Sequence, residues 1–150
     1  MNTTFKHSIQ SQTLVCLQFI LIFTLLYGTM FIKINCIAIL FLIGAALLIF
    51  WSIFAMRKSK FRIMAEPSAN AILIINGPYR FIRHPMYTAV LLFCVGLLIC
   101  NFSIIRFLLI VALTVVLIIK LSIEENLLVQ KFKAYREYCN HTSKLFPLVF

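Results

Sequence analysis

The sequence predicts an all-α polytopic membrane protein with about four transmembrane helices. Of its 150 residues, 63% are hydrophobic and only 12% are charged, and the mean hydropathy is +1.03. Soluble domains average roughly 45–50% apolar and 25% charged residues. A spanning helix needs roughly 20 apolar residues, and four stretches of the chain approach that length. These observations predict a single helical membrane domain that comprises residues 1–150.

The four predicted spans cover residues 14–32, 36–56, 86–105 and 107–123. Only a few residues around Lys33 separate the first two, so we expect those two to be antiparallel neighbours. The third is predicted to begin at the motif that contains Pro85, because proline suits the first turn of a helix, where a missing N–H costs nothing. Residues 101–103 interrupt the apolar run and mark the turn to the fourth span.

Two further segments are predicted to lie against the membrane face. The connection between the second and third spans is long, and residues 69–75 within it are mostly apolar and precede the turn sequence Asn76-Gly77-Pro78. From Asn126 onward, apolar and polar residues alternate with helical periodicity. We therefore expect a C-terminal amphipathic helix that lies along the membrane surface.

The net charge of +10 is explained by orientation in a membrane. All of the 14 Lys and Arg residues except Lys33 and Arg106 fall on one side of the four-span arrangement. The positive-inside rule makes that side cytoplasmic, together with both termini. The basic residues flank apolar segments and do not form a patch with interleaved aromatic residues, which argues against a nucleic-acid partner. Anionic lipid headgroups are the expected partner of the excess charge.

The five cysteines show no paired spacing and no C-x-x-C, so neither a disulfide framework nor a metal site is predicted.

Polar clusters at the ends of the third and fourth spans are the candidate functional residues. The first is the run Gly77-Pro78-Tyr79-Arg80-Phe81-Ile82-Arg83-His84-Pro85-Met86-Tyr87, and the second is Lys120-Leu121-Ser122-Ile123-Glu124-Glu125. If the residues between them form a helical hairpin, the two clusters meet at one membrane face. That geometry predicts a cofactor pocket on the cytoplasmic side.

Each of these residue types also has a purely structural interpretation. The arginines can anchor the chain by the positive-inside rule, and the tyrosines can belong to an interfacial aromatic belt. His84 can cap a helix, and the glutamates can pair with nearby lysines at the surface. Two charged clusters at adjacent span ends favour the functional interpretation.

The two clusters resemble the membrane methyltransferases that include isoprenylcysteine carboxyl methyltransferase and the phospholipid methyltransferases. The resemblance runs from about residue 69 to the C-terminus and rests on G-P-Y-R-x-x-R-H-P-x-Y, an apolar hairpin and E-E-x-x-L, followed by Phe132, Tyr135, Tyr138 and Pro147. It implies S-adenosyl-L-methionine as cofactor, bound without a Rossmann domain, and the chain contains no G-x-G-x-x-G element.

The resemblance also implies which residues bind the cofactor. By position they are Tyr79, His84, Pro85, Met86, Tyr87 and Glu124, together with the pocket-lining residues Ala71, Ile72, Leu73 and Ile74. The cofactor carries a carboxylate, an ammonium, ribose hydroxyls and a sulfonium, so it needs cationic donors, a carboxylate and aromatic faces. Arg83 or His84 is expected to hold its carboxylate, and Glu124 to accept from its ammonium or ribose.

Two residues are candidates for handling the methyl acceptor. Lys120 stands where the carboxyl methyltransferase branch has an arginine that holds the acceptor, although lysine lacks the planar fork. An amine acceptor must lose a proton before transfer, and Glu125 or a pocket tyrosine is the candidate base. A carboxylate acceptor needs no base.

The predicted function is methyl transfer from S-adenosyl-L-methionine to a lipid or lipidated small molecule. The acceptor is either a prenylcysteine-type carboxylate or a phospholipid-type amine. The alternatives are a nicotinamide-dependent membrane reductase of the sterol or enone type and a non-catalytic membrane scaffold. The sequence does not predict an oligomeric state.

Overall fold

The computed structural model describes residues 3–27, 35–57 and 73–147. Within these residues the chain is helical. The elements in order are α1 (Thr3–Tyr27), α2 (Cys36–Met56), the 3-10 helix η1 (Gly77–Arg80), α3 (Pro85–Cys100), α4 (Ile104–Lys131) and α5 (Tyr135–Asn140).

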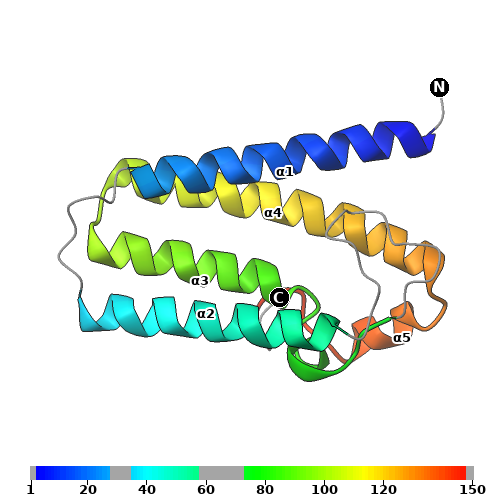
Figure 1. Ribbon diagram of the computed structural model, residues 1–150. Coiled ribbons are helices and arrows are strands. Elements are labelled where there is room, and N and C mark those ends of the chain that lie inside the picture. The colour runs from blue at the N-terminus through cyan, green and yellow to red at the C-terminus, as the bar shows by residue number, and fades with distance from the viewer. Residues whose placement is uncertain (1–2, 28–34, 58–72, 148–150) are drawn as a thin grey trace.

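The four long helices lie side by side and alternate in direction (Figure 1). Their order across the molecule is α1, α4, α3, α2, with the end of α4 and the short helix α5 at the same end as the start of α1. The main helix pairs are α2 with α3 and α1 with α4, and α3 and α4 join the two pairs. The first two helices run antiparallel as expected, but the prediction that they are neighbours was wrong, because α1 and α2 lie at opposite edges of the layer and each packs chiefly against a later helix.

The core lies where α1, α3 and α4 meet. Its buried residues are Leu25 from α1, Leu91 and Cys94 from α3, Ile110, Leu113, Leu117 and Leu121 from α4, and Leu145 from the C-terminal segment. The pairing of α2 with α3 depends on Gly96. A Cβ at that position would lie 3.1 Å from Leu42 Cδ2 and 3.3 Å from Phe41 Cβ. The missing side chain thus allows the two backbones to approach closely.

Helix boundaries follow the predicted spans with instructive exceptions. α2 coincides with the predicted 36–56, and Asn35 caps it by accepting a hydrogen bond from the Ile37 N–H at 3.2 Å. α3 ends at Cys100 and α4 begins at Ile104, so the prediction of residues up to 105 for the third span was too long.

Both α1 and α4 extend beyond their apolar stretches. α1 begins at Thr3, well before residue 14, and α4 continues through Glu124 and Glu125 to Lys131. Residues 126–131 therefore continue α4, and the six-residue α5 follows in the described part of the chain. A C-terminal amphipathic helix along the membrane surface stays a prediction.

Among the residues that the structure describes, two helices, α2 and α4, are long and apolar enough to cross a membrane. The apolar part of α1, Gln12–Tyr27, and the whole of α3 are shorter. α2 also exposes large apolar side chains along its length, among them Leu40 at 70%, Phe50 at 73% and Phe54 at 70%. Such a surface suits contact with lipid. A count of four spans stays a prediction.

Candidate functional site

The motif of residues 77–87 begins with η1, and its backbone conformation holds it in place. Gly77 has a φ of +65°, a left-handed conformation that favours glycine. A Cβ there would also lie 3.1 Å from Ala55 Cβ and 3.3 Å from Trp51 Nε1 on α2. Pro85 then occupies the first turn of α3, as predicted. His84 is the N-terminal cap residue, but its side chain makes no capping hydrogen bond, so capping does not account for its imidazole.

The two polar clusters meet, which confirms the geometry expected of a helical hairpin. The Tyr87 hydroxyl donates to Glu124 Oε1 at 2.5 Å, between residues that are 37 positions apart in the chain. Arg83 Nε donates to Glu125 Oε1 at 2.6 Å across 42 positions. The start of α3 thus supplies donors to two carboxylates near the end of α4.

His84 lies between the two carboxylates. Its Nδ1 is 3.7 Å from Glu124 Oε2 and its Nε2 is 3.5 Å from Glu125 Oε1. The imidazole stacks on the Tyr87 ring, with 5.3 Å between centroids and 2° between planes. Nε2 is buried and makes no hydrogen bond with any residue that the structure describes. A buried polar atom of this kind has free capacity for a ligand.

Arg83 is held by the protein on several sides. Besides Glu125, its Nη1 donates to the carbonyl oxygens of Cys139 at 3.0 Å and Thr142 at 2.5 Å. Its side chain is 8% exposed, so it is not a surface anchor. These bonds use much of the guanidinium fork, which leaves His84 better suited than Arg83 to bind a ligand carboxylate.

The C-terminal segment closes one side of the cluster. Ser143 forms a parallel β-bridge with Ile82, the Arg83 N–H donates to the Ser143 carbonyl at 2.8 Å, and the His84 N–H donates to the Lys144 carbonyl at 3.1 Å. The Thr88 hydroxyl donates to the Leu145 carbonyl at 2.5 Å. The backbone of the motif is thereby fixed from residues that follow it by more than 50 positions.

Two tyrosines connect η1 with α5. The Tyr138 hydroxyl donates to the Tyr79 carbonyl at 2.5 Å. Burial raises the pKa of Tyr138 to about 12 and, together with the neighbouring Tyr138 and Glu124, raises the pKa of Tyr79 well above its ordinary value. Both phenols therefore remain protonated at neutral pH, which disfavours either one as a general base.

Lys120 lies in the interior, one helical turn before Glu124 on α4. It is 7% exposed, its Nζ donates to Gln18 Oε1 on α1 at 3.2 Å, and Nζ lies 5.0 Å from the centroid of the Tyr87 ring. The ring in turn stacks on His84. Lys120 is thus joined to the cluster, as its place in the sequence predicts.

The other predicted pocket residues are less well defined. Pro85 is buried and Met86 is half-buried at the start of α3, and Leu73 and Ile74 are half-buried before η1. Ala71 and Ile72 lie outside the described residues.

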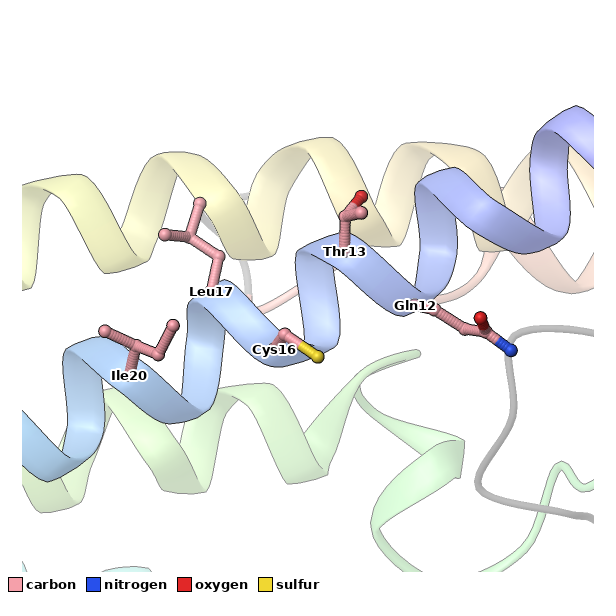
Figure 2. Close-up of a pocket in the computed structure, with 5 residues that line it drawn as sticks. All are labelled: Gln12, Thr13, Cys16, Leu17 and Ile20. Carbon is pink, nitrogen blue, oxygen red and sulfur yellow. The ribbon is translucent and has the colours of Figure 1, made fainter.

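Two hollows on the surface of the described residues have linings that leave out the cluster. One of about 500 Å³ separates residues 73–80 from α5 and is lined by Leu73, Ile75, Asn76, Arg80, Ala134, Glu137, Tyr138, His141 and Thr142. The other, of about 480 Å³, is shown in Figure 2 and is lined by Gln12, Thr13, Cys16, Leu17 and Ile20, all from α1. Among described residues, neither lining includes His84, Tyr87 or Glu124.

Sequence reasoning missed several partners of the predicted residues. One is Gln18, the partner of Lys120, and a lone amide in an apolar run is a signal that some buried polar group needs a partner. Thr142 and the carbonyl of Cys139 gave no such signal, because backbone acceptors are present at every residue. Their role depends on the chain path after α4.

The cluster suits a ligand that carries both cationic and hydroxyl donors. It offers two half-buried carboxylates, an imidazole nitrogen without a hydrogen bond to the described residues and an aromatic face, all between α3 and α4. In the described parts of the chain, no group of three or more His, Cys, Asp or Glu side chains could hold a metal ion.

Comparison with known proteins agrees with the resemblance seen in the motifs. A family model described as phospholipid methyltransferase matches residues 34–135. That range contains α2, η1, α3, α4 and therefore both polar clusters. No curated protein matches the chain.

Proposed function

Because the chain belongs to the phospholipid methyltransferase family, we propose that it transfers a methyl group from S-adenosyl-L-methionine to a membrane lipid. Family membership supports methyl transfer and a lipid substrate, and it favours this function over a nicotinamide-dependent reductase or a scaffold. The observation that carries the proposal is the convergence of His84, Tyr87 and Glu124 from two helices.

The residues of the cluster fit the methyl donor. Glu124 keeps Oε2 for the ammonium or a ribose hydroxyl, because its Oε1 already accepts from Tyr87. His84 Nε2, which lies 3.5 Å from Glu125 Oε1 and makes no hydrogen bond with the described residues, is assigned to the carboxylate of the donor. Tyr79, Pro85 and Met86, with residues 71–74, are proposed to line the same site. When bound, S-adenosyl-L-methionine supplies an electrophilic methyl group on a sulfonium.

The contribution of the protein to the transfer is chiefly positioning. Methyl transfer is an in-line displacement that needs no covalent nucleophile on the enzyme, and holding two reactants in line removes much of the barrier. For an amine acceptor, Glu125 remains the candidate base. Its pairing with Arg83 at 2.6 Å stabilises the carboxylate anion, which makes Glu125 a weak base and places more of the catalysis on positioning.

The proposed location follows from the same observations. Two apolar helices and the family support membrane association. We propose four spans, with the site and both termini on the cytoplasmic side, where the basic residues gather.

Calorimetry on the detergent-purified protein tests the donor site. We expect saturable binding of S-adenosyl-L-methionine that becomes at least about tenfold weaker in Glu124→Gln, since a hydrogen bond to a charged group contributes roughly 1.5–3 kcal/mol. His84→Ala should weaken binding similarly. Glu137→Gln on α5 makes the same chemical change at an exposed position and should bind normally.

A folded protein with no saturable binding of the methyl donor would overturn the proposed function. The acceptor class is tested separately, by transfer of a labelled methyl group to phosphatidylethanolamine or to a prenylated cysteine in mixed micelles. An amine product and a methyl ester are readily distinguished by their stability to alkali.

A further inference from the structure

Gln18 and Lys120 form a buried polar pair that links α1 to α4. Gln18 is 8% exposed and Lys120 is 7% exposed, and the Lys120 Nζ donates to Gln18 Oε1 at 3.2 Å. The two helices lie side by side along their length (Figure 1). A lysine buried in an apolar bundle is costly and usually serves a function. The burial of the Lys120 ammonium therefore indicates that this residue has a function.

The ammonium of Lys120 makes no ion pair with any residue that the structure describes. Within the described parts of the chain, the ion pairs join Arg83 to Glu125 and His84 to the two glutamates, and none involves Lys120. Glu124, one turn away, accepts its hydrogen bond from Tyr87. Nζ contacts a neutral amide and the face of the Tyr87 ring, and the Glu124 carboxylate attracts it from a greater distance without forming an ion pair. The amide and the ring orient the cation and do not cancel its charge.

We propose that Gln18 is a positioning residue that holds the Lys120 ammonium beside Tyr87 for an anionic group of the methyl acceptor. That group is a phosphate or a carboxylate, each of which an ammonium binds as a point charge. The inference rests on the proposed function, because the Tyr87 ring that faces Nζ also belongs to the donor site. The inference makes α1 part of the acceptor site, although α1 precedes residues 34–135, which the family model matches.

The competing account is that Gln18 only joins two helices, as amide side chains do in membranes. Gln18→Glu separates the two accounts. A glutamate of nearly the same shape keeps the acceptor oxygen and strengthens the attraction to Lys120, so a purely structural link survives or improves. It also neutralises the ammonium, so an anionic acceptor loses its partner.

For Gln18→Glu we expect unchanged affinity for S-adenosyl-L-methionine, an unchanged or higher melting temperature, and a KM for the acceptor raised at least about tenfold with a much smaller change in kcat. The matched control is Gln12→Glu. It makes the same change on the same helix, at an exposed position on the face shown in Figure 2, and should leave all four quantities unchanged.

The assay uses phosphatidylethanolamine and a prenylated cysteine as separate acceptors in uncharged micelles. A KM effect confined to one acceptor assigns the anion as phosphate or carboxylate. An unchanged KM for every acceptor that the wild-type protein methylates would overturn the role of Gln18 while leaving the methyltransferase assignment intact. A wild-type protein that binds no methyl donor refutes the assignment itself.

If Gln18→Glu does not fold, Lys120→Gln gives a second test with the charge removed and an amide pair retained. The same rise in acceptor KM at constant donor affinity is expected. A normal acceptor KM in Lys120→Gln contradicts the inference.

Discussion

The sequence left two roles open for Arg83, which are anchoring the chain at the membrane and binding the carboxylate of the cofactor. Its contacts in the structure show a third role. Its guanidinium binds Glu125 on α4 and two backbone carbonyls at the end of α5 and just beyond it, so one side chain ties α3 to the segment that closes the site. A lysine at this position could meet the carboxylate but lacks the fork that reaches the carbonyls at the same time.

Substitution of Arg83 should therefore lower stability more than a surface charge change would. Removing one partner of a buried ion pair costs roughly 3–5 kcal/mol, so we expect Arg83→Ala to lower the melting temperature strongly and Arg83→Lys to have an intermediate effect. Thermal unfolding in detergent measures both. Arg80→Lys, at an exposed position on η1, is the control. A normal melting temperature for Arg83→Ala would show that Arg83 does not stabilise the contact between α3 and the C-terminal segment.

At the scale of single residues, the sequence predicted which residues form the cluster but not which of them pair with each other. The residues His84, Tyr87, Glu124 and Glu125 were identified because two polar clusters stand at the ends of adjacent spans and because their motifs resemble those of a known family. Their pairing was not predictable. Whether Arg83 contacts Glu124 or Glu125 depends on the rotation of α4 about its axis, which hydropathy does not encode.

Among the elements, the contact between α2 and α3 is the closest helix pairing. It depends on a glycine on α3, since Gly96 faces the side chains of Leu42 and Phe41. Gly44 on α2 makes an informative contrast, because a Cβ built there has no atom within 4 Å among the described residues. Two helical glycines of the same chain thus have opposite steric surroundings.

A valine at each glycine tests this contrast. Gly96→Val must push α2 away from α3, and overpacking of this kind costs roughly 1–3 kcal/mol, so the melting temperature should fall. Gly44→Val adds a side chain in open space and should leave the melting temperature nearly unchanged. Equal melting temperatures in the two variants would contradict the role of the α2–α3 contact, because the change in helix propensity is the same at both positions.

Helix ends were predictable where a sharp chemical change coincides with the end of the helix. Asn35 before α2 is such a case, because its side chain both breaks the apolar run and caps the helix. The ends of α1 and α4 were missed, because polar residues such as Thr3 and Glu124 continue the helix after the apolar pattern stops. Hydropathy finds the part of a helix that lipid would cover, and not the part that continues into water.

On the scale of the whole molecule, the cluster lies at one end of the helical layer. The end of α4, η1 and α5 gather there, while the turn between α3 and α4 lies at the other end (Figure 1). If α3 and α4 both span the membrane, Asn101 and the site face opposite aqueous compartments. The basic residues around the site predict that its side is cytoplasmic.

Cysteine labelling in intact cells tests this topology. In a background with the five native cysteines replaced, Asn101→Cys and His141→Cys each place one thiol at an exposed position, at the α3–α4 turn and beside the site respectively. An impermeant maleimide should label Asn101→Cys in intact cells, and should label His141→Cys only after permeabilisation, because charge bias orients the basic end inward. Labelling of both from the same side would show that α3 and α4 do not form a membrane-crossing hairpin. The reverse pattern would keep the hairpin and place the methyl-donor site outside the cytoplasm, where S-adenosyl-L-methionine would have to be supplied by another route.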